Sequence, residues 1–227
     1  MKFVEGVPTD AVTAIAGRIS DELLRGKRVL WLVSGGSNVG LQVQIMNEVR
    51  AKAADRLEGL AILPMDERYG EYGHKDSNSQ QMREAGFDPG KATWVDVLTH
   101  NVPFDQTVSF YSDVATTAFA NAGVVVSQFG LGPDAHIAGL LPDSPAISAE
   151  PVVVIGYEWS DYIRLTLSPE MLKTVQVGYV PAFGENKRAA LKRLKKNDEP
   201  FEKLPAKLLY DLPEVYVYTD KLTKKEK

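Results

Sequence analysis

Asp134 and His136 stand two residues apart in the segment GLGPDAHIAGLLPDS, residues 130–144. This segment follows GVVVSQFG, an apolar run typical of a buried strand. An imidazole has an ordinary pKa of about 6.5, so it can accept a proton near neutral pH, and a neighbouring carboxylate can orient the ring or a substrate. The pair therefore predicts a general base at the end of a strand. The alternative is a histidine that only forms a hydrogen bond within its loop.

A second candidate is the turn SGGSNVG, residues 34–40, between an apolar run and a helical pattern. Glycines let the backbone approach a ligand closely, and the free N–H groups of a helix start favour an anion such as phosphate. The expected phosphate-binding residues of this turn are Ser34, Gly35, Gly36 and Ser37. The alternative is a tight turn that needs glycine for its geometry alone. Because Val39 occupies the last position of the hydrolase elbow motif, Ser37 is a poor candidate nucleophile.

A third candidate is MDERYGEYGHKDSN, residues 65–78, which places charged residues directly after a strand pattern. An arginine at this position could bind a phosphate through two parallel hydrogen bonds, which makes Arg68 a candidate ligand. A solvated cluster of charges is the alternative interpretation. Ser77 is predicted to cap the helix that follows.

The elements that must position these loops alternate along the chain. The expected helices cover residues 9–25, 38–53, 77–86, 104–120, 184–196 and 205–211, and the expected strands cover 28–33, 59–65, 92–97, 123–130, 151–156, 162–167, 174–180 and 214–218. This order predicts an α/β, Rossmann-like fold with a mostly parallel sheet and helices on both faces. Ligands of such sheets bind beyond the carboxyl ends of the strands, where all three candidate loops begin.

Composition limits the classes of partner. The chain has 227 residues, 44% of them hydrophobic and 25% charged, which predicts a single α/β domain over 1–227 with a short disordered basic tail near 221–227. A net charge of −4 argues against nucleic acid and membrane surfaces as partners, and the basic segment 186–196 is interpreted as a solvated helix face. We expect a cytoplasmic protein that is a monomer or small homo-oligomer.

Metal chemistry is not expected from the side chains available. The chain contains no cysteine, and its three histidines lack a paired metal-ligand spacing. We therefore predict neither a metal nor a cofactor.

The motifs together resemble the 6-phosphogluconolactonase family, within the wider group that includes glucosamine-6-phosphate isomerases. The resemblance covers roughly residues 10–218 and rests on five motifs in order. They are Ser34 to Ser37; Asp66, Glu67 and Arg68 with Ser77 and Asn78; Gly130, Gly132, Asp134 and His136; Arg164, Thr166 and Leu167; and Gly184 with Lys187.

This resemblance implies hydrolysis of 6-phosphogluconolactone, a phosphorylated sugar lactone of the pentose phosphate pathway. His136 would deprotonate the attacking water, while Asp134 and Asp66 would orient the imidazole or the ring hydroxyls. The resemblance also implies phosphate ligands, namely the glycine turn, Arg68, Arg164 and Lys187.

Two features bear on the branch of the family. The isomerases carry a glutamate five residues after the histidine, and this chain has Leu141 there, so hydrolysis is favoured over isomerisation. Ala135 stands where the family has glycine. If that position requires a positive φ, the methyl group would cost about 1–2 kcal/mol or change the loop. A sugar-phosphate-binding protein with weakened catalysis is therefore an alternative, and an isomerase is a less favoured one.

Overall fold

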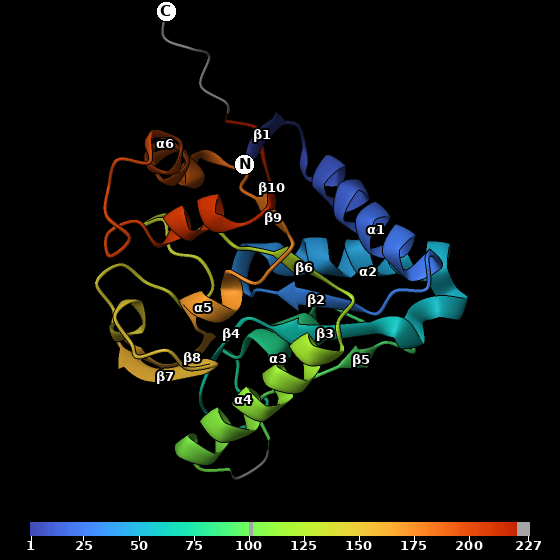
Figure 1. Ribbon diagram of the computed structural model, residues 1–227, viewed down its shortest axis with the longest axis horizontal. Coiled ribbons are helices and arrows are strands. Elements are labelled where there is room, and N and C mark those ends of the chain that lie inside the picture. The colour runs from blue at the N-terminus through green and yellow to red at the C-terminus, as the bar shows by residue number, and fades with distance from the viewer. Residues whose placement is uncertain (100–101, 222–227) are drawn as a thin grey trace, which may run out of the picture.

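A computed structural model describes residues 1–99 and 102–221 and places a seven-stranded, fully parallel sheet at the centre of the fold (Figure 1). In spatial order the strands are β1 (Lys2–Glu5), β10 (Glu214–Thr219), β9 (Val177–Pro181), β6 (Val124–Gln128), β2 (Val29–Val33), β3 (Leu60–Pro64) and β5 (Thr93–Trp94). The predicted α/β fold with a mostly parallel sheet is confirmed. Residues 222–227, most of the predicted basic tail, lie outside the described residues.

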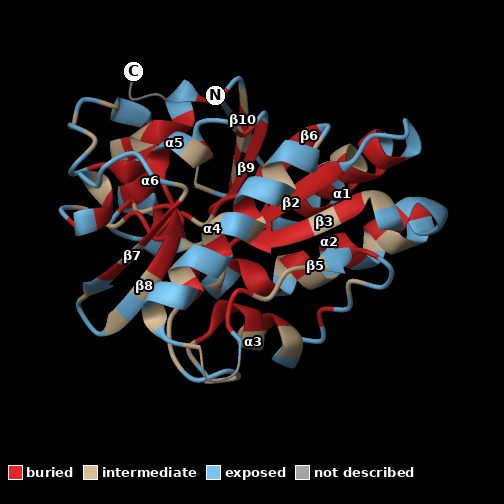
Figure 2. Cartoon of the chain, turned by 60° about the horizontal axis from the view of Figure 1, so that its bottom comes forward, coloured by how far each residue is buried: buried red, intermediate tan, exposed pale blue. Residues whose placement is uncertain are grey.

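Helices cover both faces of this sheet. They are α1 (Pro8–Leu24), α2 (Val39–Ala53), α3 (Asn78–Glu84), α4 (Phe104–Asn121), α5 (Pro169–Leu172) and α6 (Arg188–Lys196). Strand β2 shows why: Trp31 packs in one core cluster with α1 and α2, whereas Leu30 and Leu32 pack in another with α4, α5 and α6. The central strands are accordingly buried over their whole length (Figure 2).

A small antiparallel sheet lies beside the carboxyl edge of the main sheet. Its order is β4 (Asp66–Arg68), β8 (Tyr162–Leu167) and β7 (Val154–Trp159). The predicted strand regions near 151–156 and 162–167 therefore pair with each other, because a two-residue turn joins β7 to β8 directly. Residues 66–68, which we expected in a loop, form a short edge strand of this second sheet.

Smaller differences from the sequence prediction concern short elements. Strand β1 was not predicted, since its four residues KFVE carry little pattern. The helix expected at 184–196 begins as a 3-10 turn, Glu185–Lys187, before α6, and the helix expected at 205–211 is a 3-10 helix, Pro205–Asp211. In the described part of the chain, no helix is long and apolar enough to cross a membrane.

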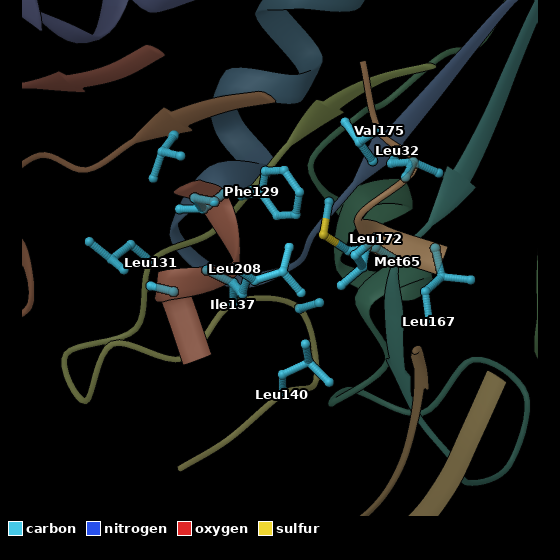
Figure 3. Packing of buried hydrophobic residues seen from close by; sticks show 14 of the residues in the cluster. Leu32, Met65, Phe129, Leu131, Ile137, Leu140, Leu167, Leu172, Val175 and Leu208 are labelled. Atoms are coloured by element: carbon cyan, nitrogen blue, oxygen red, sulfur yellow. The ribbon is translucent and has the colours of Figure 1, made fainter. Parts of the chain in front are cut away.

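The loop that follows β6 is anchored in the core by its apolar side chains. Phe129, Leu131, Ile137 and Leu140 are each at most 2% exposed, and they pack among the residues of the cluster that Figure 3 shows, including Leu208. Burial of four large side chains in one loop holds its backbone in place. The polar residues between them are therefore presented from a fixed frame.

We predict that Gly35→Ala lowers the free energy of unfolding by roughly 1–3 kcal/mol, because a Cβ there must displace a buried amide. That Cβ would lie 1.9 Å from the Oδ1 atom of Asn78, whose Nδ2 donates to Asp66. Urea unfolding followed by circular dichroism measures the change. Gly17→Ala is the matched control: its Cβ would meet nothing within 4 Å in α1, so stability should rise by up to about 1 kcal/mol. Equal stability of the Gly35→Ala variant and the wild type would contradict the close contact.

Candidate active site

Four neighbouring strands bring the predicted site residues to one edge of the sheet. Strands β9, β6, β2 and β3 lie side by side and parallel, so their carboxyl ends meet at the same edge. The segments that follow them contain, in this order, Lys187, the Asp134–His136 loop, the turn 34–37 and Arg68. Arg164 joins the group because it pairs directly with Arg68 across β4 and β8.

Asp134 and His136 form a hydrogen-bonded pair. One carboxylate oxygen of Asp134 lies 2.6 Å from the imidazole Nδ1 of His136 and also accepts from the main-chain N–H of His136 at 3.2 Å. Partial burial opposes ionisation of Asp134, but the hydrogen bond and charge of His136 prevail and lower the pKa of this carboxyl to about 2. An ionised carboxylate can only accept, so Nδ1 donates to Asp134, and whenever the ring is neutral Nε2 has the lone pair.

The imidazole of His136 is oriented by Asp134 and is partly exposed. Its side chain is 34% exposed, and among the described residues its Nε2 has no hydrogen-bond partner. A base oriented by a carboxylate on one nitrogen and open on the other matches the arrangement used for general-base catalysis. A histidine that only forms a hydrogen bond within its loop would show the same bond to Asp134, with water at its exposed Nε2.

The turn around this pair depends on Gly132. A Cβ at Gly132 would lie 2.1 Å from Nδ1 of His136, so only glycine admits the imidazole at this position. The N–H of Gly132 donates to the carbonyl of His136 at 2.9 Å, and the N–H of Ala135 donates to the carbonyl of Gly132 at 3.0 Å. These two bonds close a compact turn with Asp134 at its tip.

Ala135 adopts the left-handed conformation, with φ of 69°. The position takes a positive φ, as a family glycine would suggest, and alanine adopts it here. The methyl group is fully buried in the core, and the Ala135 carbonyl accepts from the N–H of Ala206 at 3.1 Å. Burial of the methyl group offsets part of the conformational cost of about 1–2 kcal/mol. His136 is not turned away from Asp134.

Lys187 places a buried cation against the same loop. Its Nζ donates to the carbonyl of Leu131 at 2.6 Å, and the residue is only 8% exposed. Burial lowers the pKa of this ammonium, and the charge of Asp134 opposes the shift. In the described part of the chain Lys187 forms no ion pair with a carboxylate, so two of its three N–H donors stay available to a ligand.

The glycine turn is tied to the loops on both sides. Ser34 is buried, and its hydroxyl donates to the carbonyl of Gln128 at 3.3 Å. Asn38 donates through Nδ2 to the carbonyl of Phe129 at 3.2 Å. Ser34 therefore serves the connection between β2 and β6, while Gly36 and Ser37 lie on the exposed side at the start of a helical turn, where N–H groups lack intrahelical partners.

Asn78 links the glycine turn to Asp66. Its Nδ2 donates to the main-chain oxygen of Asp66 at 2.9 Å and to its carboxylate at 3.1 Å, and its buried Oδ1 has no hydrogen-bond partner within the described residues. The same Oδ1 is the atom that approaches Gly35. Asp66 is itself buried, so a solvated cluster of charges does not describe this segment.

Glu67 is a structural acceptor that the sequence did not reveal. It is 1% exposed and accepts from the main-chain N–H groups of Arg68, Asn78 and Ser79, at 2.8, 2.6 and 3.0 Å, and from the Ser77 hydroxyl at 3.0 Å. Burial raises the pKa of Glu67, and the three N–H donors oppose the shift. Ser77 also caps α3, as predicted. Glu67 thereby fixes α3 and Asn78 against the end of β3.

Arg68 and Arg164 stand directly opposite each other on β4 and β8. Among the described residues neither forms an ion pair with a carboxylate, and the buried Nε of each has no hydrogen-bond partner. One guanidinium N–H of Arg68 donates to the carbonyl of Asp76 at 3.0 Å. Like charges paired across strands destabilise a sheet, and an anion between them would remove that penalty.

Other possible sites are weaker. A cavity of about 510 Å³ lies beside α4 at the amino ends of β2 and β3, and none of the predicted site residues lines it. Across the described residues, histidine, aspartate and glutamate side chains form no group of three that could hold a metal ion. The carboxyl edge of the sheet is therefore the candidate active site.

Comparison with known proteins assigns the family. The family model described as glucosamine-6-phosphate isomerases/6-phosphogluconolactonase matches residues 5–217. The chain belongs to this family. The predicted resemblance is confirmed.

Three matching proteins share little sequence identity with this chain. A 6-phosphogluconolactonase of Helicobacter pylori is 24% identical over 151 residues, which cover 64% of this chain and 65% of that relative. The crystal structure of a 6-phosphogluconolactonase from Shewanella baltica matches with a TM-score of 0.78 and 20% identity, over 96% of each chain. A monomeric glucosamine-6-phosphate deaminase matches with a TM-score of 0.76 and 15% identity, over 97% of this chain and 98% of that one. Since proteins of both names share the fold, the reaction must be inferred from the site residues.

We predict that Ala135→Gly changes the free energy of unfolding by less than about 1 kcal/mol, because relief of the left-handed conformation and loss of a buried methyl group act in opposite directions. The imidazole nitrogen resonances of His136 in NMR spectra should stay unchanged, because the turn already has the shape that glycine would adopt. A large shift of these resonances would show that the methyl group displaces the ring.

Proposed function

We propose that this protein hydrolyses 6-phosphogluconolactone to 6-phosphogluconate. The observation that carries the proposal is the Asp134–His136 pair at the same sheet edge as Arg68, Arg164 and Lys187, three cations that form no ion pair with a carboxylate of the described residues. Such an edge offers a base for one end of a substrate and cationic groups for an anionic end. The names of the relatives support the same activity.

The spacing of the strands suits a sugar phosphate. The loops of His136 and Arg68 follow β6 and β3, which are separated by β2 alone. Two strand spacings amount to roughly 10 Å, a distance that a six-carbon sugar with a terminal phosphate can span. The phosphate would bind between Arg68 and Arg164 with the N–H groups of the glycine turn and Lys187 as further donors.

The proposed chemistry begins with water. The Nε2 atom of His136 takes a proton from a water molecule, and the resulting hydroxide attacks the lactone carbonyl carbon. The ionised Asp134 stabilises the imidazolium that forms. The tetrahedral intermediate collapses with cleavage of the bond between the carbonyl carbon and the ring oxygen, which recovers a proton from the imidazolium. The oxyanion would need N–H donors other than those of the turn 34–37 that bind the phosphate, and Asp66 would orient a sugar hydroxyl.

Two residues favour hydrolysis over the alternatives. Leu141 lacks the carboxyl group that ring opening in an isomerase would need at this position. Ala135 gives no reason for weakened catalysis, since His136 keeps its bond to Asp134 with alanine in the turn. The proposal therefore does not require a protein that binds sugar phosphates without turnover.

The proposed partner is a small phosphorylated lactone, and the proposed setting is the cytoplasm. A net charge of −4 supports a small anionic ligand held by a local cationic site rather than a nucleic acid or a membrane surface.

We predict that His136→Ala lowers kcat/KM for 6-phosphogluconolactone by at least about tenfold, and by up to about 10⁴-fold, because the base is lost. Asp134→Asn should also lower it, because the imidazolium loses its anionic partner. A continuous lactonase assay, with spontaneous hydrolysis subtracted, measures the rates. Asp143→Asn is the control in the same loop, since Asp143 pairs with Lys203 at the surface. A wild-type rate for His136→Ala would reject the assigned base.

We predict that Arg164→Ala raises the KM for 6-phosphogluconolactone by about tenfold or more. The kcat/KM for unphosphorylated gluconolactone should hardly change, because the proposed contact of this guanidinium is with the phosphate and with no other part of the substrate. Arg164→Lys should restore only part of the affinity, since a lysine offers no planar pair of donors. Arg50→Ala, which removes a surface pair with Asp88, is the control. Equal losses for both lactones would place Arg164 outside the phosphate site.

A further inference from the structure

We propose that Tyr162 is a positioning residue of the phosphate site, whose ring holds the guanidinium groups of Arg68 and Arg164 together for one anion. The inference deepens the proposed function and rests on it in naming a phosphorylated sugar as the ligand.

The geometry begins with the alternation of side chains along β8. Tyr162 and Arg164 are two residues apart on this strand and so lie on the same face of the small sheet. Arg68 pairs with Arg164 across the strands. The guanidinium carbon of Arg68 lies 5.5 Å from the centre of the Tyr162 ring, and that of Arg164 lies 5.1 Å from it. One aromatic ring therefore contacts both cations.

Charge explains why such a ring is useful. The two guanidinium groups repel each other in the absence of a ligand, and within the described residues no carboxylate pairs with either of them. The negative face of an aromatic ring attracts a cation without neutralising it. Tyr162 can hold both groups near each other, whereas an aspartate or glutamate would compete with the incoming phosphate.

The contact also limits the freedom of two long side chains. When an arginine side chain must be ordered on binding, the entropy cost lowers the affinity for the anion. A side chain that is already held in position avoids this cost. Arg68 has a second restraint in its bond to the carbonyl of Asp76, while within the described residues the Arg164 side chain donates no hydrogen bond. We therefore expect Arg164 to depend on Tyr162 more than Arg68 does.

The ring rather than the hydroxyl carries this role. In the described part of the chain, the Tyr162 hydroxyl has no hydrogen-bond partner, whereas the hydroxyls of Tyr69 and Tyr157 donate to main-chain carbonyls. Phenylalanine keeps the ring, and leucine or threonine removes it. These substitutions separate the two parts of the side chain.

The test is calorimetric titration with 6-phosphogluconate, together with steady-state kinetics. Tyr162→Leu should weaken binding of 6-phosphogluconate by about 5- to 30-fold and raise the KM for the phosphorylated lactone similarly, with kcat within about twofold. Tyr162→Phe should stay within about twofold of the wild type on both measures. Tyr162→Thr gives a second ring-free variant that suits a strand.

Tyr216→Leu is the matched control, because it removes a ring that contacts the cation of Lys2 at 5.6 Å in the main sheet. Wild-type affinity for 6-phosphogluconate in both ring-free variants would overturn the inference. A loss of affinity in Tyr162→Phe as large as that in Tyr162→Leu would overturn it as well. Binding of the product needs no turnover, so a wild-type protein that binds 6-phosphogluconate without hydrolysing the lactone would count against the proposed function alone.

Discussion

Parallel pairing of β9, β6, β2 and β3 is the constraint on which the site depends. Each strand is followed by a loop with a different chemical group, and the parallel direction of the strands brings these loops to one edge of the sheet. A reversed strand would carry its group to the opposite edge, roughly 17 Å away for a five-residue strand. The sheet thus determines roughly where each polar group lies, and the conformation of each loop adjusts its position by only a few ångströms.

Within that frame, buried polar side chains join each loop to its neighbour. Ser34 and Asn38 bind carbonyls at the end of β6, and Asn78 binds Asp66 while lying against Gly35. The groups in these bonds are buried away from water, and a buried polar group without a partner lowers the stability of the fold. The loops are therefore coupled in position. The expected result is a site whose parts shift together or not at all.

Much of this arrangement could be read from the sequence. The alternation of strand and helix patterns along the chain predicted the mostly parallel sheet with helices on both faces. The sequence also indicated which loops carry the polar groups. It could not reveal that Arg164 faces Arg68, because their pairing joins segments far apart in the chain through a strand of only three residues, DER. Nor could it show that Glu67 is buried, since a charged residue beside two others is typical of a surface.

In the loop after β6, buried side chains hold the backbone in place, whereas the residue types at its exposed positions are not restricted by packing. Phe129, Leu131, Ile137 and Leu140 anchor it, and Asp134 and His136 project between them. Substitution of a residue between the anchors leaves the anchors, and with them the fold, in place. Proteins named as lactonase and as deaminase share this architecture, so the frame itself does not specify one reaction.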